Sequence, residues 1–155
     1  SLGNILIAHS EQGICAIVLS NNVAELVSEL KNRFAKADCI LDEKKNAAIT
    51  AKIIKHIESP TASDDFALDI RGTDFQRKVW QQLQKISFGK TITYTDLAKK
   101  IGAPKSVRAV ANACGANAIA ILIPCHRVIR QDGSLSGYRW GIERKALLLQ
   151  REIKQ

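Results

Sequence analysis

The feature that most constrains the fold is an apolar run at residues 119–123, which ends in Pro124, Cys125 and His126. Such a run carries the backbone into the interior, and the proline stops any regular pattern there. Burial raises the pKa of a thiol unless a base or a cation lies close to it, and His126 and Arg127 are candidates for both. The stretch therefore has two interpretations: an inert core cysteine, or a partly buried nucleophile beside its base.

The composition is that of a globular protein. The 155 residues suit one domain or two small ones, with 46% hydrophobic and 25% charged residues. No apolar run approaches the roughly 20 residues that span a bilayer, and no secretory leader is recognisable. We therefore expect a cytoplasmic protein without a membrane partner. The chain opens at Ser1 without an initiator Met, which favours a piece of a longer protein.

Four cysteines, Cys15, Cys39, Cys114 and Cys125, are spaced irregularly, with no CxxC pair and no zinc-finger spacing of histidines. An unpatterned set in a chain of this size is typical of reduced thiols in a cytosolic compartment. Cys15 and Cys114 are expected to be packing residues.

Charge is distributed unevenly along the chain. Residues 1–70 hold seven Lys or Arg and ten Asp or Glu, a net charge of −3, whereas residues 71–155 hold sixteen and five, a net charge of +11. A solvated basic surface would explain this, but asymmetry of this size indicates a polyanion as partner. It also divides the chain near residue 70.

The first part is expected to form a small α/β domain with a short antiparallel sheet. Two β-favouring runs, 5–9 and 14–19, flank turn residues, which predicts a hairpin. Residues 66–70 alternate as a third strand would.

Helical spacing of apolar residues predicts helices at 23–37 and 47–57 in the same part. His56 lies beside the apolar stripe of the second helix and is expected at the surface. Residues 59–65 have the composition of a loop.

The second part is expected to be mostly helical. Thr73 is placed to cap its first helix. A last helix is expected at 142–153, where Glu152 sets a carboxylate against the helix dipole, a hint that another group holds it. Residues 131–134 mark a hairpin-type turn, and 136–141 form a Gly- and aromatic-rich loop, either a structural turn or a pocket wall.

Two short helices with a tight turn are predicted at 94–101 and 104–114. Thr93 makes a capping-box-like start, and Gly102 suits the end of the first helix. Pro104 suits the first turn of the second. The pair is typical of a helix-turn-helix, with an ordinary αα-hairpin as the alternative.

The second of these helices carries one long cation, Arg108, among small residues. Small side chains let a helix approach a groove closely, and an arginine can reach into the base stack. In the basic half of the chain this pattern indicates DNA contact. The small residues are Ser106, Ala109, Ala111 and Ala113.

Together these residues resemble a known family. The motif at 124–128, preceded by residues 108–110 and Asn117, is similar to that of the O6-alkylguanine-DNA alkyltransferases, for which it is highly specific. The similarity extends over the whole chain. The segments that look most like the C-terminal domain of Ada-type bacterial adaptive-response regulators are 69–73, 79–80 and 136–141.

The resemblance implies a suicide alkyl transfer in which Cys125 attacks the O6-alkyl carbon and keeps the group as a thioether. His126 would act as base through a bridging water, since adjacent residues of an extended segment point in opposite directions. Glu152 would orient and charge the histidine, and Asn117 would tie the helix-turn-helix to the active-site segment. Tyr94 would disturb the 3′ phosphate and donate a proton to the departing guanine.

The resemblance also implies the DNA contacts and the guanine pocket. Arg108 would fill the space of a flipped nucleotide, and the small helix residues would lie in the minor groove, where sequence readout is weak. The expected DNA-contacting residues are Tyr94, Thr95, Ser106, Val107, Arg108, Ala109, Ala111 and Arg127. The expected pocket residues are Val128, through its carbonyl, Tyr138 and Arg139.

The resulting fold class is α/β (α+β): a ribonuclease H-like N-terminal domain at 1–70 and a DNA-binding, alkyl-acceptor domain with a helix-turn-helix at 71–155. The expected partner is double-stranded DNA, bound through the minor groove by a monomer that is part of a longer chain with an N-terminal regulatory domain. We expect no cofactor. We also expect no metal, because the zinc site of some relatives has no convincing ligand set among Cys15, Cys39, His9 and His56.

Two other functions stay open at this point. A damage sensor or transcriptional regulator would bind DNA without transferring a group, although relatives of that kind lack the acceptor cysteine. A cysteine hydrolase could use Cys125, His126 and Glu152, but it leaves the basic half of the chain unexplained.

Overall fold

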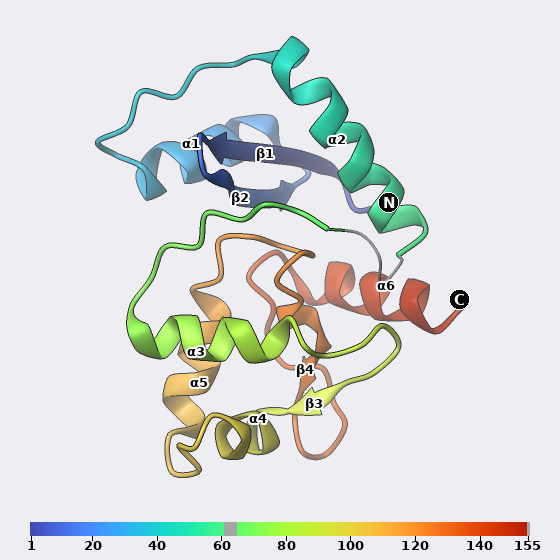
Figure 1. The fold of residues 1–155 in the computed structure, drawn as a ribbon. Coiled ribbons are helices and arrows are strands. Elements are labelled where there is room, and N and C mark those ends of the chain that lie inside the picture. Colours follow the sequence, from blue (N-terminus) through green and yellow to red (C-terminus); the bar gives the residue numbers. More distant parts are fainter. Residues whose placement is uncertain (61–64, 155) are drawn as a thin grey trace.

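The computed structural model describes residues 1–60 and 65–154, and it begins with an antiparallel hairpin (Figure 1). β1 (Asn4–Ser10) pairs with β2 (Gly13–Ser20) along its whole length, with one irregularity after Ala8. β2 is the buried strand, whereas β1 is only half-buried. The hairpin and the core position of Cys15 were predicted correctly.

β2 also pairs with two segments from later in the chain. Ile14 exchanges two backbone hydrogen bonds, of 2.8 and 2.9 Å, with the segment 66–70. This segment therefore joins the sheet as predicted, but through a single parallel bridge rather than a full strand. Ile17 exchanges two bonds of 3.0 Å with residues 118–120, so the strand holds the start of the apolar run in place.

Two helices accompany the hairpin in the upper half of Figure 1, α1 (Val23–Arg33) and α2 (Glu43–Glu58). α1 ends before the predicted residue 37. α2 begins before the predicted residue 47, because the Asp42 side chain caps it by accepting from the Lys45 amide at 3.0 Å. Of the predicted loop at 59–65, residues 61–64 lie outside the described residues.

The predicted surface position of His56 is wrong. Its side chain is buried, with 8% exposure, and its ring lies 5.4 Å from the Phe66 ring and 5.6 Å from the Phe88 ring, centroid to centroid. These aromatic rings come from other segments, so the periodicity of α2 alone does not show that they cover the histidine.

The second part of the chain is mostly helical, as predicted. Its helices are α3 (Asp74–Leu83), α4 (Tyr94–Lys100), α5 (Val107–Gly115) and α6 (Ile142–Ile153), and a short parallel pair joins β3 (Ile92–Thr93) to β4 (Val128–Ile129). Thr73 caps α3 in a reciprocal capping box with Gln76. Trp80 ties α3 to α5 by donating from Nε1 to the Ala113 carbonyl at 2.8 Å.

α4 and α5 follow each other closely. Thr93 caps α4, and Gly102 follows it with a φ of +76°, as expected for a glycine just after a helix. The expectation that Pro104 opens the next helix is wrong. The chain makes a further turn, with the Ser106 amide donating to the Ala103 carbonyl, and α5 begins at Val107.

The apolar run is buried as predicted, but it is neither a strand nor extended. Short-range bonds fold it into turns, and Ile121 has a φ of +74°, a strained value for a β-branched residue. The run leads into a short 3₁₀ helix, η1 (Cys125–Arg127). The expected extended geometry at Cys125 and His126 is therefore wrong.

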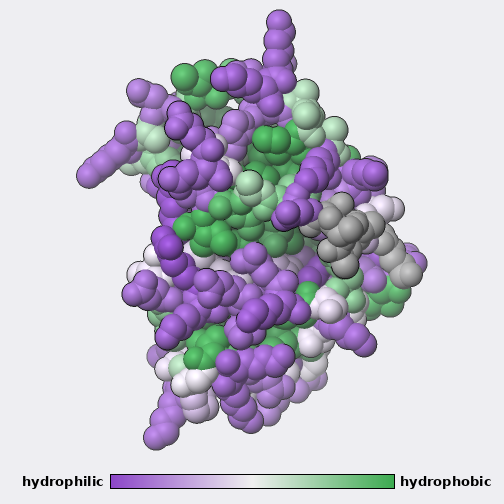
Figure 2. Space-filling model, viewed as in Figure 1, coloured by the Kyte–Doolittle hydropathy of each residue, from purple (hydrophilic) through white to green (hydrophobic). Residues whose placement is uncertain are grey.

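One hydrophobic core contains residues from both sides of position 70, including Ile17, Ile53, Leu83 and Ile123, so the boundary there stays a prediction. Figure 2 shows a hydrophobic band across the middle of one face, with hydrophilic side chains over most of the rest. Within the described residues, the helices are too short or too polar to cross a bilayer.

Candidate active site

Cys125 stands at the start of η1 with 5% exposure. Burial raises the pKa of its thiol to about 11. The strongest opposing effects are a hydrogen bond from Asn117, whose Nδ2 lies 3.3 Å from Sγ, and the positive charge of Lys145. A backbone hydrogen bond and the charge of Arg139 act in the same direction. The thiol is therefore protonated at neutral pH and requires a base before it can act as a nucleophile.

Asn117 fixes the chain around the thiol. This fully buried residue follows α5, and its Nδ2 donates to the Ile123 carbonyl at 2.9 Å while lying 3.3 Å from the Ile119 carbonyl. Its Oδ1 accepts from the Ile119 amide at 2.9 Å. One amide thus links the end of α5, the strained turn and Sγ, as the predicted tie between them requires.

His126 and Glu152 form a buried pair, with Nε2 of the histidine 2.8 Å from Oε1 of the carboxylate. Burial opposes the charge on Glu152, but hydrogen bonds from His126 and Arg127 outweigh it and lower the pKa of the carboxyl to about 2. Burial also lowers the pKa of His126, despite the neighbouring carboxylate. At neutral pH the histidine is therefore neutral and the glutamate charged.

This charge state fixes the histidine tautomer. A carboxylate only accepts hydrogen bonds, so Nε2 of His126 carries the proton and Nδ1 keeps a free lone pair. Nδ1 is buried and has no hydrogen-bond partner within residues 1–60 and 65–154. A basic nitrogen is thus available one residue away from the thiol.

Arg127 does not fit the expected DNA contact, and we correct that expectation. It is 5% exposed, and its Nη2 donates to Glu152 at 2.7 Å while Nη1 donates to the Ile86 carbonyl. Its guanidinium lies 4.6 Å from the centre of the Phe88 ring. The arginine therefore compensates the buried carboxylate instead of facing solvent.

Lys145 was missed by the sequence reasoning. It is fully buried on α6, where its Nζ donates to the Val128 carbonyl at 2.5 Å and lies 3.5 Å from the Ser136 carbonyl. Burial lowers the pKa of this amine. The helical spacing does place Lys145 on the same face as Leu148 and Glu152. Because lysines are rarely fully buried, this spacing alone does not predict a buried functional lysine.

The loop at 136–141 lies over the site. Tyr138 packs edge-on against Trp140, with ring centroids 5.3 Å apart, and its hydroxyl is buried without a hydrogen-bond partner in the described part of the chain. Burial, followed by the proximity of Cys125, raises the pKa of Tyr138 well above its usual value. Ser136 bonds the Tyr94 hydroxyl at 2.6 Å. The loop thus carries Tyr138 and is tied through Ser136 to Tyr94 on α4.

Arg139 is turned away from this cluster. Its Nε donates to Glu29 on α1 at 2.8 Å, and Nη1 donates to the Gly115 carbonyl at 3.3 Å. The side chain therefore forms no hydrogen bond with the thiol or with Tyr138, although its positive charge acts to lower the pKa of Cys125.

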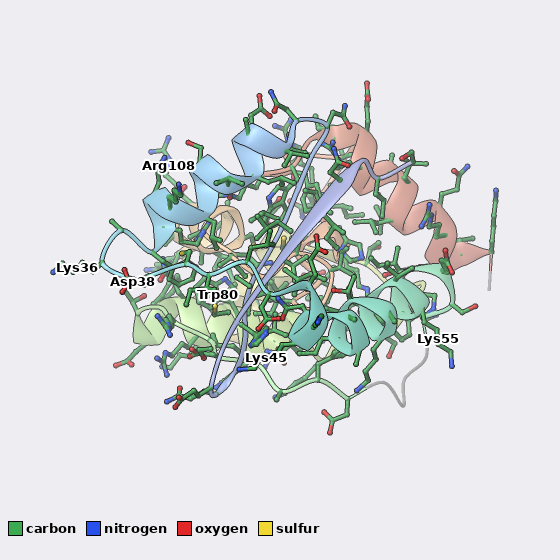
Figure 3. The ribbon with its side chains drawn as sticks, turned by 90° about the horizontal axis from the view of Figure 1, so that it is seen from above. Lys36, Asp38, Lys45, Lys55, Trp80 and Arg108 are labelled. Atoms are coloured by element: carbon green, nitrogen blue, oxygen red, sulfur yellow. The ribbon has the colours of Figure 1, made fainter. Side chains whose placement is uncertain are left out.

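The other residues expected on DNA lie on α4 and α5 or, for Ser106, directly before α5. Arg108 is exposed and forms no hydrogen bond or ion pair with any residue that the structure describes. Figure 3 shows it at the edge of the molecule, whereas Trp80 lies within. The half-buried or exposed neighbours are Tyr94, Thr95, Ser106, Val107, Ala109 and Ala111.

The chain is also similar to known proteins. Residues 74–154 match the family model described as the 6-O-methylguanine DNA methyltransferase, DNA binding domain. The chain is 51% identical over 160 residues to the bifunctional transcriptional activator/DNA repair enzyme Ada of Escherichia coli, covering 99% of this chain and 43% of that protein. It thus spans less than half the length of that relative.

A shorter relative matches over most of its length. An inducible methylated-DNA–protein-cysteine methyltransferase of Bacillus subtilis is 37% identical, with 96% of this chain and 84% of that protein covered. Among solved structures, Mycobacterium tuberculosis OGT in complex with DNA aligns with a TM-score of 0.78 and 31% identity, covering 99% of this chain and 88% of that one.

Proposed function

Since the chain belongs to the 6-O-methylguanine DNA methyltransferase family, we propose that it repairs DNA by moving an alkyl group from O6 of guanine to Cys125. The observation that carries this proposal is the buried thiol held by Asn117 beside a neutral His126 whose Nε2 is engaged by Glu152. This arrangement supplies a nucleophile, a base and an orienting carboxylate.

In the proposed reaction the Sγ proton passes to Nδ1 of His126, through a bridging water. The thiolate attacks the O6-alkyl carbon, a C–S bond forms, and the C–O6 bond breaks with its electron pair leaving on guanine. Tyr94 then donates a proton to the departing base. Because burial raises the pKa of Tyr94, its hydroxyl is protonated before the step.

The reaction ends there. A thioether resists hydrolysis, so each molecule acts once, unlike a cysteine hydrolase whose acyl-enzyme is released by water. No cofactor or metal takes part in this scheme, since the thiol, the imidazole and the phenol supply all the groups that it needs.

On the DNA side we propose that α4 and α5 form a helix-turn-helix that enters the minor groove of duplex DNA. A target carbon inside a duplex is out of reach of a buried thiol, so the base must be flipped at a cost of about a few kcal/mol. We assign the filling of the gap to Arg108, and its exposure together with small neighbours such as Ala109 supports close approach to DNA. The net charge of +11 over residues 71–155 supports binding to a polyanion.

We also propose a fold type for the N-terminal part, a longer parent chain, a cellular location and an oligomeric state. The hairpin, extended at Leu68 and accompanied by α1 and α2, supports a small ribonuclease H-like unit. Match to part of Ada supports a longer parent chain with a regulatory domain before this one. The four cysteines are free thiols, which supports a cytoplasmic location, and we propose that the repair unit acts as a monomer.

The test is to incubate the protein with a duplex containing one O6-methylguanine and to measure product against protein. We expect a plateau at one equivalent and a single added methyl on the peptide that holds Cys125. Cys125→Ala should bind DNA but transfer nothing, whereas Cys114→Ala, which removes the neighbouring buried thiol, should keep the stoichiometry. Product release beyond one equivalent, or an unmodified protein on saturated DNA, would overturn the proposal.

A further inference from the structure

Glu29 joins two arginines from distant parts of the chain. Its Oε1 accepts from Nε of Arg139 at 2.8 Å and from Nη2 of Arg33 at 3.4 Å. Glu29 and Arg33 are one turn apart on α1, whereas Arg139 belongs to the loop at 136–141. We call these three residues the clasp.

The clasp also meets the end of α5. Nη1 of Arg139 lies 3.3 Å from the Gly115 carbonyl, and Nη1 of Arg33 lies 3.5 Å from the Ala116 carbonyl. Carbonyls at a helix C-terminus carry partial negative charge and favour nearby cations. The two cations also repel each other, and burial together with the charge of Arg139 lowers the pKa of Arg33. Glu29 is therefore the group that allows both guanidinium groups to occupy this position.

The clasp is too exposed to be a major source of stability. The side chains of Glu29, Arg33 and Arg139 are 24%, 20% and 35% exposed, and they border an open hollow of about 830 Å³ between α1 and the end of α5. Ion pairs with this degree of exposure contribute little to folding. The clasp instead fixes the position of the loop, because it connects the loop to α1 and to the end of α5.

The loop carries the wall of the proposed guanine pocket on its inner side. Tyr138 precedes Arg139, its ring packs against the core cluster that contains Cys125, and its hydroxyl is buried. The loop is also attached at Ser136, which bonds Tyr94 and accepts from Lys145, and at Trp140, whose carbonyl accepts from Arg144 at 2.7 Å. The clasp is thus the outer attachment next to Tyr138.

We propose that Glu29 is a positioning residue that sets the alkyl-size preference of the reaction proposed above, on which this inference rests. By holding Arg139 it keeps Tyr138 close to the thiol, so that a small O6-alkyl group fits and a bulky one is hindered. Release of Arg139 lets the loop move outward, which widens the space above Cys125 at the expense of precise placement of a methyl group.

The test compares single-turnover transfer rates from the same duplex carrying O6-methylguanine or O6-benzylguanine. Glu29→Gln removes the charge and keeps the size of the side chain, so we expect the benzyl-to-methyl rate ratio to rise about fivefold, the scale of one partly exposed ion pair. Glu25→Gln is the matched control, because Glu25 lies one turn earlier on α1 and bonds Ser20 rather than the loop. Its ratio should equal that of the wild type.

A second comparison shows whether Glu29 acts through Arg139. Arg139→Gln should shift the ratio in the same direction, and adding Glu29→Gln to it should change the ratio no further. An unchanged ratio in Glu29→Gln, or an equal loss of both rates as expected from a purely structural role, would overturn the inference while the wild type still transfers methyl. Failure of the wild type to transfer either group would instead refute the proposed function.

Discussion

Nε2 of His126 lies 2.8 Å from Oε1 of Glu152, and this contact joins the 3₁₀ helix that holds the thiol to the last turn of α6. The carboxylate that opposes its own helix dipole is held there by the histidine and by Arg127. The pair is buried rather than a surface ion pair, so its protonation is coupled to the stability of the fold.

Stability should therefore fall in acid in two ranges. The pKa of His126 lies below its usual value in the folded protein, so the unfolded chain takes up this proton first, and the free energy of unfolding decreases as the pH falls below about 6.5. The pKa of Glu152 is about 2. Its contribution is present above the unfolded value of about 4.3 and is lost as the pH falls from there toward the folded value.

Urea denaturation of wild type and Glu152→Gln between pH 7 and pH 3 measures how the free energy of unfolding depends on pH. The variant should be less stable at pH 7, and its curve should be flatter below pH about 4.3. Glu143→Gln, which alters an exposed carboxylate on the same helix, should follow the wild type. Parallel curves for wild type and Glu152→Gln would contradict the assignment.

Arg127→Met should destabilise the protein without weakening its contact with DNA. Removing one partner leaves Glu152 charged and only partly compensated in the interior, which costs about 3–5 kcal/mol. At equal folded fraction, the salt dependence of DNA binding should be unchanged, because a buried guanidinium releases no counterions from DNA. Arg130→Met, at an exposed neighbouring position, should not have the large stability effect. A shallower salt slope in Arg127→Met would restore the DNA-contact assignment.

Lys145→Met should slow alkyl transfer. The positive charge of Lys145 lowers the pKa of Cys125 from inside the core, so its loss should raise the thiol pKa above about 11. Each pKa unit reduces the thiolate fraction tenfold, so the single-turnover rate at pH 7 should fall, by about tenfold for each unit by which the thiol pKa rises. The rate should recover partly at high pH. Lys154→Met, at an exposed position just after α6, is the control, and a wild-type rate in Lys145→Met would rule out this role.

Much of this site follows from sequence. Thr73 and Thr93 cap their helices as their spacing predicts, and Glu152 was singled out from its position at a helix end. Local patterns report which groups lie next to each other along a helix or strand. They do not report backbone carbonyls brought from elsewhere, and for this reason Lys145, whose partners are the carbonyls of Val128 and Ser136, was missed.

The predictions for Arg127, His56 and the apolar run that were wrong also failed because of contacts between segments far apart in sequence. An arginine in the basic half of the chain is a plausible DNA contact, but the partners of Arg127, which are Glu152 and the Ile86 carbonyl, lie far away in sequence. His56 is covered by rings from other segments. The positive φ of Ile121 is imposed by the surrounding bonds, against the preference of a β-branched residue, and intrinsic propensity gives no warning of it.

Arg108→Ala should reduce transfer from duplex DNA far more than from a single strand. If the side chain fills the space left by a flipped base, its loss raises the cost of flipping, and the duplex rate should fall roughly tenfold to a hundredfold. A single strand needs no such filling, so its rate should stay near that of the wild type. Lys99→Ala changes an exposed cation on α4 and should affect both substrates alike through general attraction. If Arg108→Ala lowers the transfer rate equally on duplex and single-stranded DNA, Arg108 has no role in base flipping.

Alkylation of Cys125 should itself destabilise the fold, because Sγ is buried and lies 3.3 Å from Nδ2 of Asn117. A methyl group on sulfur displaces the amide that also bonds the carbonyls of Ile119 and Ile123. Overfilling a packed site typically costs about 1–3 kcal/mol, so the methylated protein should unfold at a lower temperature than the free thiol form. In Asn117→Ala the anchor is already lost, so the unmodified variant should start less stable and methylation should lower its melting temperature by less. Equal melting temperatures before and after stoichiometric methylation of the wild type would show that the pocket, rather than Asn117, accommodates the added group.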